Sequence, residues 1–215
     1  MDIPEPLLQR LKQNEEIAKK FYEIEASILT ILNYQDFLEK LLKEISEKFF
    51  VPHTWISIIR ESPISGQFND IDNSKLLKRS TAFVSRKDFT TATQNSLVPI
   101  LANRNLETYK ALMPESVGWR IGSIAIAPIT LDGEIVGSIN QADPARNRFE
   151  PGIDTSLLER LALKVSLCLS NVTAHEQLRF LAFHDPLTGL LNRGVMERVL
   201  EREFQRAKRY KMNLS

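Results

Sequence analysis

Apolar residues near the start of the chain recur every three or four positions, which is the spacing of one helix face. The stripe lies within residues 5–33 and consists of Ile17, Phe21, Ile24, Ile28 and Ile31. It predicts one long helix with a heptad-like seam, which fits either the core of its own domain or a second chain. A long N-terminal helix outside the main core has few intrachain surfaces to cover, which favours the second chain. Another amphipathic helix is expected over about 35–50, before Pro52.

Three stretches have the residue types of β-strands. Residues 54–60 (TWISIIR) are rich in β-branched and aromatic side chains. Residues 122–129 and 134–141 are apolar at nearly every position, and Asp132 and Gly133 lie between them. Because glycine accepts the positive φ that a tight turn requires, these two strands are predicted to form a central hairpin.

The middle of the chain gives weaker signals. Residues 61–80 are polar and predict a loop that carries a short helix at 74–78. A strand is expected at 81–84. Residues 94–103 have no clean period and contain Pro99.

A second long helix is predicted from Asp154 to about Ala182. Its apolar stripe again has 3-4 spacing and comprises Leu158, Leu161, Val165, Cys168 and Val172. Beyond Val172 the stripe falters, because Leu178 and Leu181 lie one step aside. Such an offset resembles a stutter, which changes the phase of a coiled coil. We interpret the stripes of both long helices as the seam of a homodimer.

The composition narrows the class of protein. The 215 residues are 43% hydrophobic and 26% charged, which suits a domain of ordinary size with its own core. The formal net charge of +1 gives no electrostatic case for nucleic acid or a membrane surface as a partner. No apolar run approaches the roughly 18–20 residues of a membrane span, and the acidic start lacks the features of a secretory signal. Cys168 is the only cysteine, so an intrachain disulfide is excluded, and we expect a cytoplasmic protein.

The stretch FHDPLTGLLNR at 183–193 has a distinctive order of turn and cap residues, and an amphipathic helix follows it to about Lys211. Pro186 ends the preceding helix, and Gly189 supports a turn. The stretch resembles the entry to GGDEF domains, the catalytic domains of diguanylate cyclases. The resemblance implies a role in transmission, not in catalysis, for Asp185, Thr188, Asn192 and Arg193. The same residues also fit simple turn and cap positions, and the two roles are compatible.

The GGDEF resemblance covers Ala182–Ser215 only. The catalytic strands, the Gly-Gly-Asp/Glu-Glu-Phe turn and the metal-binding carboxylates of that family are not among these residues. We therefore expect no catalytic residues and no enzymatic activity here, and GTP and Mg²⁺ belong to the missing catalytic part alone. The resemblance implies that the full-length parent is a diguanylate cyclase.

The order of helix, strand, variable middle, central hairpin, loop and long exit helix is similar to that of the GAF fold. Arg148-Phe149, Pro151-Gly152 and Leu157-Leu158 through Leu161 match the RF-x-PG…LL-x-x-L run of a GAF-like family of bacterial domains of unknown function. The resemblance implies an α+β fold with long N- and C-terminal flanking helices. It also implies a six-stranded antiparallel sheet with helices on one face and a small-molecule pocket on the other.

Both resemblances together divide the chain into four parts. These are an N-terminal helix over 1–34, a GAF-like sensory domain over 35–172 whose exit helix begins near 154, a signalling helix and hinge over 173–184, and the N-terminal fragment of a GGDEF domain over 185–215.

The pocket that the GAF resemblance implies lies between the sheet and the variable loops. Its candidate lining residues are Trp55, Ser57, Trp119, Arg120, Ser123, Ala125, Ser138 and Asn140. Arg120 suits an anionic ligand and Trp119 suits stacking, although Trp55 and Trp119 also fit the role of core aromatics. The three histidines lack metal-ligand spacing, so neither a metal nor another cofactor is expected.

These patterns predict an intracellular sensory and dimerisation module of a diguanylate cyclase. It would respond to an unidentified small molecule and signal through a coiled-coil helix to a GGDEF domain. That domain would make cyclic di-GMP from two GTP, so two copies have to face each other. The alternative is a structural dimerisation or protein-docking module that has no small-molecule ligand.

Overall fold

The computed structural model describes residues 4–67, 74–118 and 120–210. The chain divides into two compact units, Met1–Val172 and Thr173–Ser215, and each is described by itself. Within the described ranges no helix combines the length and the apolar character needed to cross a membrane.

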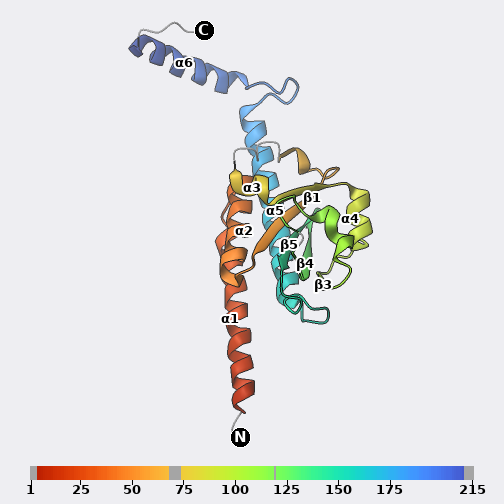
Figure 1. The fold of residues 1–215 in the computed structure, drawn as a ribbon. Coiled ribbons are helices and arrows are strands. Elements are labelled where there is room, and N and C mark those ends of the chain that lie inside the picture. Colours follow the sequence, from red (N-terminus) through yellow and green to blue (C-terminus); the bar gives the residue numbers. More distant parts are fainter. Residues whose placement is uncertain (1–3, 68–73, 119, 211–215) are drawn as a thin grey trace. The chain divides into compact units, whose positions relative to one another are not determined.

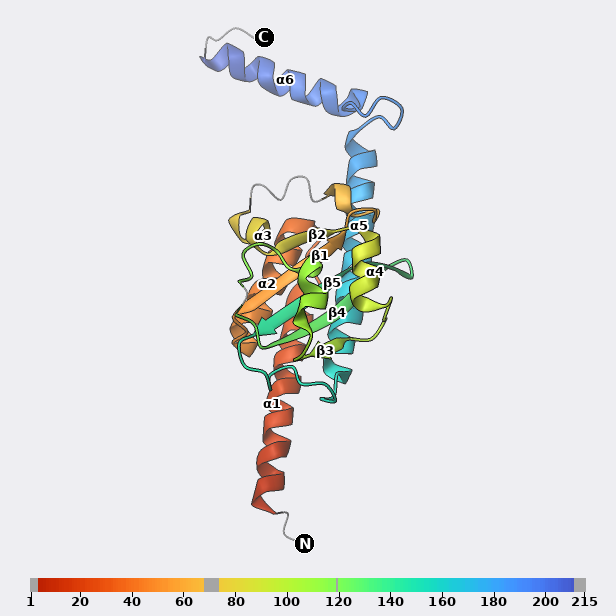
Figure 2. The ribbon, with the colours of Figure 1, turned by 45° about the vertical axis from the view of Figure 1, so that its right-hand side comes forward.

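The first unit is built on one five-stranded sheet, and the predicted α+β class is confirmed (Figures 1 and 2). The strand order is β2-β1-β5-β4-β3. The bounds are β1 His53–Ile59, β2 Thr81–Val84, β3 Ile100–Ala102, β4 Ser123–Leu131 and β5 Glu134–Asp143. The sheet is antiparallel except that β2 runs parallel to β1. The described residues therefore form five strands, one fewer than the resemblance implied.

The central hairpin follows the expected turn chemistry. Asp132 and Gly133 both have positive φ, 51° and 85°, which suits a two-residue connection between β4 and β5. Gly137 of β5 allows a close approach to β1. A Cβ atom at this position would lie 2.1 Å from the carbonyl oxygen of Ser57 in β1.

Three helices cover one face of the sheet (Figure 2). They are α1 Glu5–Ile28, α2 Tyr34–Phe49 and the first part of α5 Ser156–Phe183. Phe21, Ile24 and Ile28 pack in the same core as Leu161 and the strand residues of this face. The N-terminal helix is thus part of the domain from Phe21 onward.

This packing corrects the expected dimer seam. Of the nine candidate residues, Phe21, Ile24, Ile28, Leu161, Val165, Cys168 and Val172 are buried in the chain's own core. Only Ile17 and Leu158 keep accessible surface. The stripes have helical spacing because they face the sheet, so a second chain cannot reach most of them in this arrangement.

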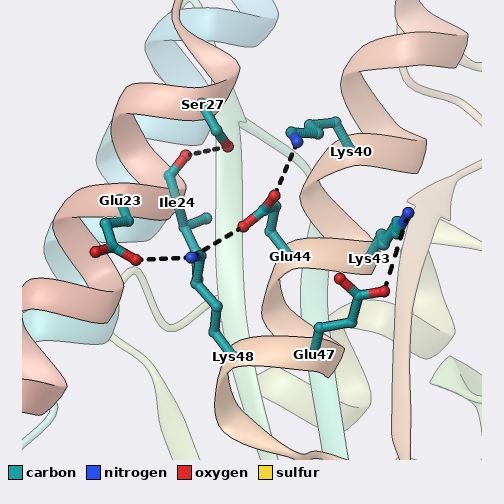
Figure 3. Close-up of polar contacts among 8 residues, drawn as sticks. All are labelled: Glu23, Ile24, Ser27, Lys40, Lys43, Glu44, Glu47 and Lys48. Carbon is teal, nitrogen blue, oxygen red and sulfur yellow. Dashed lines mark hydrogen bonds and ion pairs between the residues drawn. The ribbon is translucent and has the colours of Figure 1, made fainter.

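Ion pairs join the helices of this layer. Lys48 of α2 contacts Glu23 of α1 at 2.7 Å and Glu44 at 3.4 Å, and Lys40 contacts Glu44 at 2.8 Å (Figure 3). The hydrogen bond from Lys48 lowers the pKa of Glu23 below its ordinary value. On the other side of α1, Arg160 of α5 donates to the buried Glu25 at 2.9 Å.

The opposite face of the sheet carries two shorter elements, α4 Arg86–Thr93 and the 3₁₀ helix η2 Leu106–Leu112. The short helix α3 Lys75–Arg79 instead packs beside α2, with Leu77 in the core of the helical face. Phe89 of α4 and Leu112 of η2 share a second core with Trp55. Helix α4 was missed, although Ser85 caps it by accepting from the Asp88 amide and donating to its carboxylate. The Ser-x-x-Asp spacing is the signal that could have found it.

The second unit contains the end of α5 and helix α6 Arg193–Tyr210. A tight turn joins them. His184 and Leu191 form an isolated antiparallel bridge across this turn, and the amide of Asn192 donates to the carbonyl of Phe183. The turn therefore has a defined internal structure.

Candidate functional site

A buried polar cluster lies on the sheet face that carries η2. Trp55 and Ser57 are alternate residues of β1, so their side chains share a face. The register places Asn140 opposite Trp55 and Ser138 opposite Ser57. All four residues are fully buried.

The carbonyl oxygen of Leu112, the last residue of η2, is the acceptor at the centre of this cluster. It accepts from the Trp55 indole Nε1 at 2.6 Å and from the Ser57 hydroxyl at 2.7 Å. Asn140 Nδ2 donates to Ser57 Oγ at 2.7 Å, and Ser138 Oγ donates to Asn140 Oδ1 at 2.9 Å. Because buried polar groups are costly when unpaired, this network holds η2 against the sheet.

A cavity of about 370 Å³ lies beside η2 and the segment that follows it. It is lined by Leu106, Glu107, Lys110, Met113, Pro114, Glu115, Val117, Gly118 and Ile121. The hydrogen bonds to the Leu112 carbonyl therefore hold η2 in place, and η2 forms one wall of this cavity. Sequence reasoning missed the lining residues because they fall where the chain has no regular period.

The predicted pocket residues do not come together in one place. Trp119 lies outside the described residues, and Arg120 is exposed beside the cavity-lining Ile121. The register pairs Asn140 with Ile126 and Gln141 with Ala125. Directly paired residues point to the same face, so Ala125 points away from Asn140.

Ser123 also belongs to the far side of the sheet. Its hydroxyl donates to the carbonyl of Ala145 at 2.7 Å and accepts from the amide of Phe149 at 3.3 Å. Ser123 thus ties the loop after β5 to the start of β4. The pocket prediction grouped Ser123 and Ala125 with Ser138 and Asn140, but the register pairs Ser123 with Asp143 and Ala125 with Gln141, which puts them on the other face.

The hinge residues form a compact set of local bonds. The Asp185 Oδ1 atom accepts from the Leu187 amide at 3.1 Å, the Thr188 amide at 2.9 Å and the Thr188 hydroxyl at 3.1 Å. The Thr188 amide bond is the main reason that the pKa of Asp185 is lowered. A carboxylate that accepts several N–H and O–H bonds is stabilised in its charged form.

Asn192 links the two helices of the second unit. Its Nδ2 atom donates to the carbonyl of Ala182 in α5 at 2.7 Å, and its Oδ1 atom accepts from the Val195 amide of α6 at 3.0 Å. One side chain therefore bonds both helix ends. Arg193 is largely exposed and contacts Glu197 at 2.8 Å.

A second apolar stripe runs along α5 outside the core. Leu163, Leu167, Leu178 and Leu181 are each more than half exposed. Their spacing follows steps of three and four through Ser170 and Ala174. Leu178 and Leu181, which lay one step aside from the buried stripe, continue this exposed one.

The described residues contain no group of three or more histidine, cysteine, aspartate or glutamate side chains placed to hold a metal ion. Burial raises the pKa of the Cys168 thiol, which keeps it protonated near neutral pH.

No family model matches the sequence, and no curated protein matches it. Solved structures that are similar to this chain include GAF domains. The GAF domain of an Acinetobacter phosphoenolpyruvate-protein phosphotransferase is 13% identical, with a TM-score of 0.48, and the match covers 73% of this chain and 93% of that one. A GAF domain from a Pseudomonas syringae pv. tomato protein named as a sensor histidine kinase is 14% identical, with a TM-score of 0.49, over 80% and 97% of the two chains.

An A. aeolicus GAF domain in an inactive state is 16% identical, with a TM-score of 0.42, over 78% of this chain and 98% of that one. These likenesses concern the fold alone and say nothing of a ligand, a partner or a reaction.

Proposed function

We propose that this chain is the sensory and dimerisation module of a diguanylate cyclase that acts in the cytoplasm. The carrying observation is the turn at 183–193, where Asp185, Thr188 and Asn192 bond the end of α5 to the start of α6. These are the residues on which the GGDEF resemblance rests. A turn closed by its own side chains can pass a rotation of one helix to the next.

The partner in this proposal is a second copy of the chain. The exposed stripe that includes Leu163, Leu167, Leu178 and Leu181 supports it, because two parallel α5 helices would present identical leucines to each other. Apolar side chains at heptad spacing on a solvent face are expensive to leave in water. The seam is thus the outer stripe of α5, not the buried one.

The signal in this proposal is a small molecule held in the cavity beside η2. A ligand that displaces η2 would have to strain the hydrogen bonds at the Leu112 carbonyl, and those bonds reach β1 and β5. A coupling of about 1–3 kcal/mol is sufficient for a switch of this kind.

The test is a chimaera with a characterised diguanylate cyclase. Residues 1–192 of this chain replace the part of that enzyme that ends at the Asn equivalent to Asn192. Cyclic di-GMP is then measured for the direct fusion, for an insertion of three residues after Glu176, and for an insertion of seven residues at the same place. A heptad insertion keeps the phase of a coiled coil, whereas three residues rotate it.

We expect the seven-residue insertion to stay within about twofold of the direct fusion and the three-residue insertion to differ by about tenfold or more. Equal output from both insertions would contradict transmission through α5. Native mass spectrometry of the purified chain supplies the companion measurement. A dimer with an additional discrete mass is the expected species.

A structural dimerisation or docking module is the second candidate. It is favoured by one observation, which is that the polar atoms of Trp55, Ser57, Ser138 and Asn140 bond to one another and to Leu112. No ligand is needed to satisfy them. A dimer whose mass and thermal stability do not change with any added metabolite mixture would favour this candidate.

A further inference from the structure

A second cavity, of about 390 Å³, lies at the end of the domain where the RF-x-PG stretch is. Its walls come from α1, the end of α2, β3, β5 and the loop before α5. Phe21, Phe49 and Phe149 supply aromatic surface, and Leu101 and Leu158 supply aliphatic surface. The volume falls in the roughly 300–1,000 Å³ range of small-molecule sites.

The floor of this cavity contains an amide with nothing to bond to. Gln141 of β5 is only 6% exposed and lines the cavity. Within the described ranges its side-chain amide has no hydrogen-bond partner. Leu101 and Gln141 both pair with Ala125, whose small side chain leaves room between them. A side-chain amide that lines a cavity and has no protein partner can donate to and accept from a polar ligand atom.

Two cations stand at the same cavity without a carboxylate of their own. Lys20 and Arg148 both line it, and among the described residues neither forms an ion pair. Asp154 also lines it, but its two oxygens accept from the Ser156 amide at 2.9 Å and the Ser156 hydroxyl at 3.0 Å. The amide bond lowers the pKa of Asp154, so this carboxyl group stays charged. Two cations against one carboxylate still leave the lining with an excess of positive charge.

Phe50 adds an exposed aromatic ring at the rim of this cavity. It ends α2 with a φ of 52°, a left-handed conformation that a bulky residue rarely adopts, and its side chain is 83% exposed. The Lys20 ammonium lies 5.7 Å from the centroid of its ring. The conformation caps α2, because the Phe50 amide donates to the carbonyl of Ser46, and it leaves the ring in solvent beside the cavity.

Arg148 holds the loop that closes the cavity. Its Nη2 atom donates to the carbonyl of Phe49 at the end of α2 at 2.6 Å, and its guanidinium lies 6.0 Å from the Phe149 ring centroid. The remaining N–H groups of the guanidinium are available to an anion. The RF pair of the sequence motif thus contributes one cation and one aromatic wall to the same space.

We propose that this cavity binds an amphipathic aromatic carboxylic acid. The aromatic body packs among the phenyl rings, the carboxylate is held by Lys20 and Arg148, and Gln141 supplies a further hydrogen bond. Charge-assisted hydrogen bonds are the strong ones, so the acid is preferred to a neutral analogue. This site is separate from the cavity beside η2 and does not depend on the link to a cyclase.

The test uses the full chain, isothermal titration calorimetry and two probes of the same shape, 1-naphthylacetate and 1-naphthylacetamide. We expect the acid to bind about tenfold more tightly than the amide. Lys20→Met should remove most of this preference. Lys19→Met, a neighbouring lysine that does not line the cavity, is the matched control and should keep it.

A third variant reports on the place of binding. Ile153 lines the cavity and is half exposed, so Ile153→Trp can fill the space without entering the core. It should abolish binding of both probes while the thermal unfolding midpoint stays close to that of the wild type. No binding of either probe at millimolar concentration, equal affinity for acid and amide, or binding that Ile153→Trp leaves intact would each overturn the proposal.

Discussion

The indole N–H of Trp55 donates to the carbonyl oxygen of Leu112 at 2.6 Å, across 57 positions of the chain. The donor lies in the middle of the sheet, and the acceptor is the last residue of η2. This one bond connects the central strands with the wall of a cavity. It is also the point at which a stability measurement can test the polar cluster.

Replacing the indole should loosen this wall. Trp55→Phe keeps an aromatic ring but loses the N–H, and we expect the free energy of unfolding to fall by about 1–3 kcal/mol. Urea denaturation measures it. Ser57 shares the acceptor, so a double-mutant cycle with Ser57→Ala should show coupling between the two sites. Strictly additive effects would mean that the two bonds act separately.

Gly137 should not tolerate any side chain. A Cβ atom there would lie 2.1 Å from the carbonyl oxygen of Ser57. That oxygen is a backbone atom in the centre of the sheet, so it cannot swing aside as the end of a flexible side chain could. Gly137→Ala is expected to lower the free energy of unfolding by about 3 kcal/mol or more. Gly66→Ala is the matched control, since a Cβ atom there meets nothing within 4 Å. Its effect should stay within about 0.5 kcal/mol.

The pair between Arg160 and Glu25 should stabilise the domain more than a similar pair on the surface. Glu25 is buried, and removing its partner by Arg160→Met leaves a carboxylate without its counter-charge. We expect the free energy of unfolding to fall by about 1–2 kcal/mol. The effect is smaller than for a fully buried pair, because Arg160 is half exposed. Arg193→Met breaks a pair of nearly the same length, 2.8 Å against 2.9 Å. That pair is exposed, so breaking it should leave the free energy of unfolding almost unchanged.

The hinge should respond to acid through Asp185. Its pKa lies below the ordinary value of 3.8, so the charged form favours the folded turn. Because the pKa is lowered, the Asp185 carboxylate stabilises the folded turn fully above pH 3.8. This stabilisation is lost as the pH falls through the pKa of the folded state. An NMR titration should show the Asp185 carboxyl and the Thr188 amide changing together, below pH 3.8. A midpoint above this value would contradict the bonded turn.

The exposed stripe of α5 should control assembly. Leu167→Glu places a charge on the proposed seam, and sedimentation velocity at micromolar concentration should show a shift from dimer to monomer. Leu97→Glu is the control, because Leu97 is at least as exposed as Leu167 (67% against 53%) but lies in the loop before β3. It should leave the dimer unchanged. A wild-type chain that sediments as a monomer would contradict the seam altogether.

The local elements were largely predictable because their signals are local. Asp132 and Gly133 mark the hairpin turn, and both have the positive φ that the sequence pattern required. Ser85 and Asp88 carried an equally local signal for α4, which was overlooked. Residues 94–103 gave no clean period, and the structure shows why. Their strand β3 has only three residues, which is too short to show one.

The candidate site was predictable only in part. Trp55, Ser57, Ser138 and Asn140 do share one face, and this follows from alternation along β1 and β5. Ser123 and Ala125 do not join them, because the β4–β5 register pairs Asn140 with Ile126. A register is set by the whole hairpin, and a shift of one residue exchanges the two faces of a strand.

The sequence by itself determined that the chain has long amphipathic helices, a central hairpin and a turn within 183–193. Each depends on residues within a few positions of one another. Only the tertiary structure decided that the stripe through Phe21 and Leu161 faces the chain's own sheet. It also decided that Trp55 and Ser57 bond to Leu112. Periodicity shows that a helix face is buried but not what covers it, and partners more than 50 positions apart leave no trace in a local pattern.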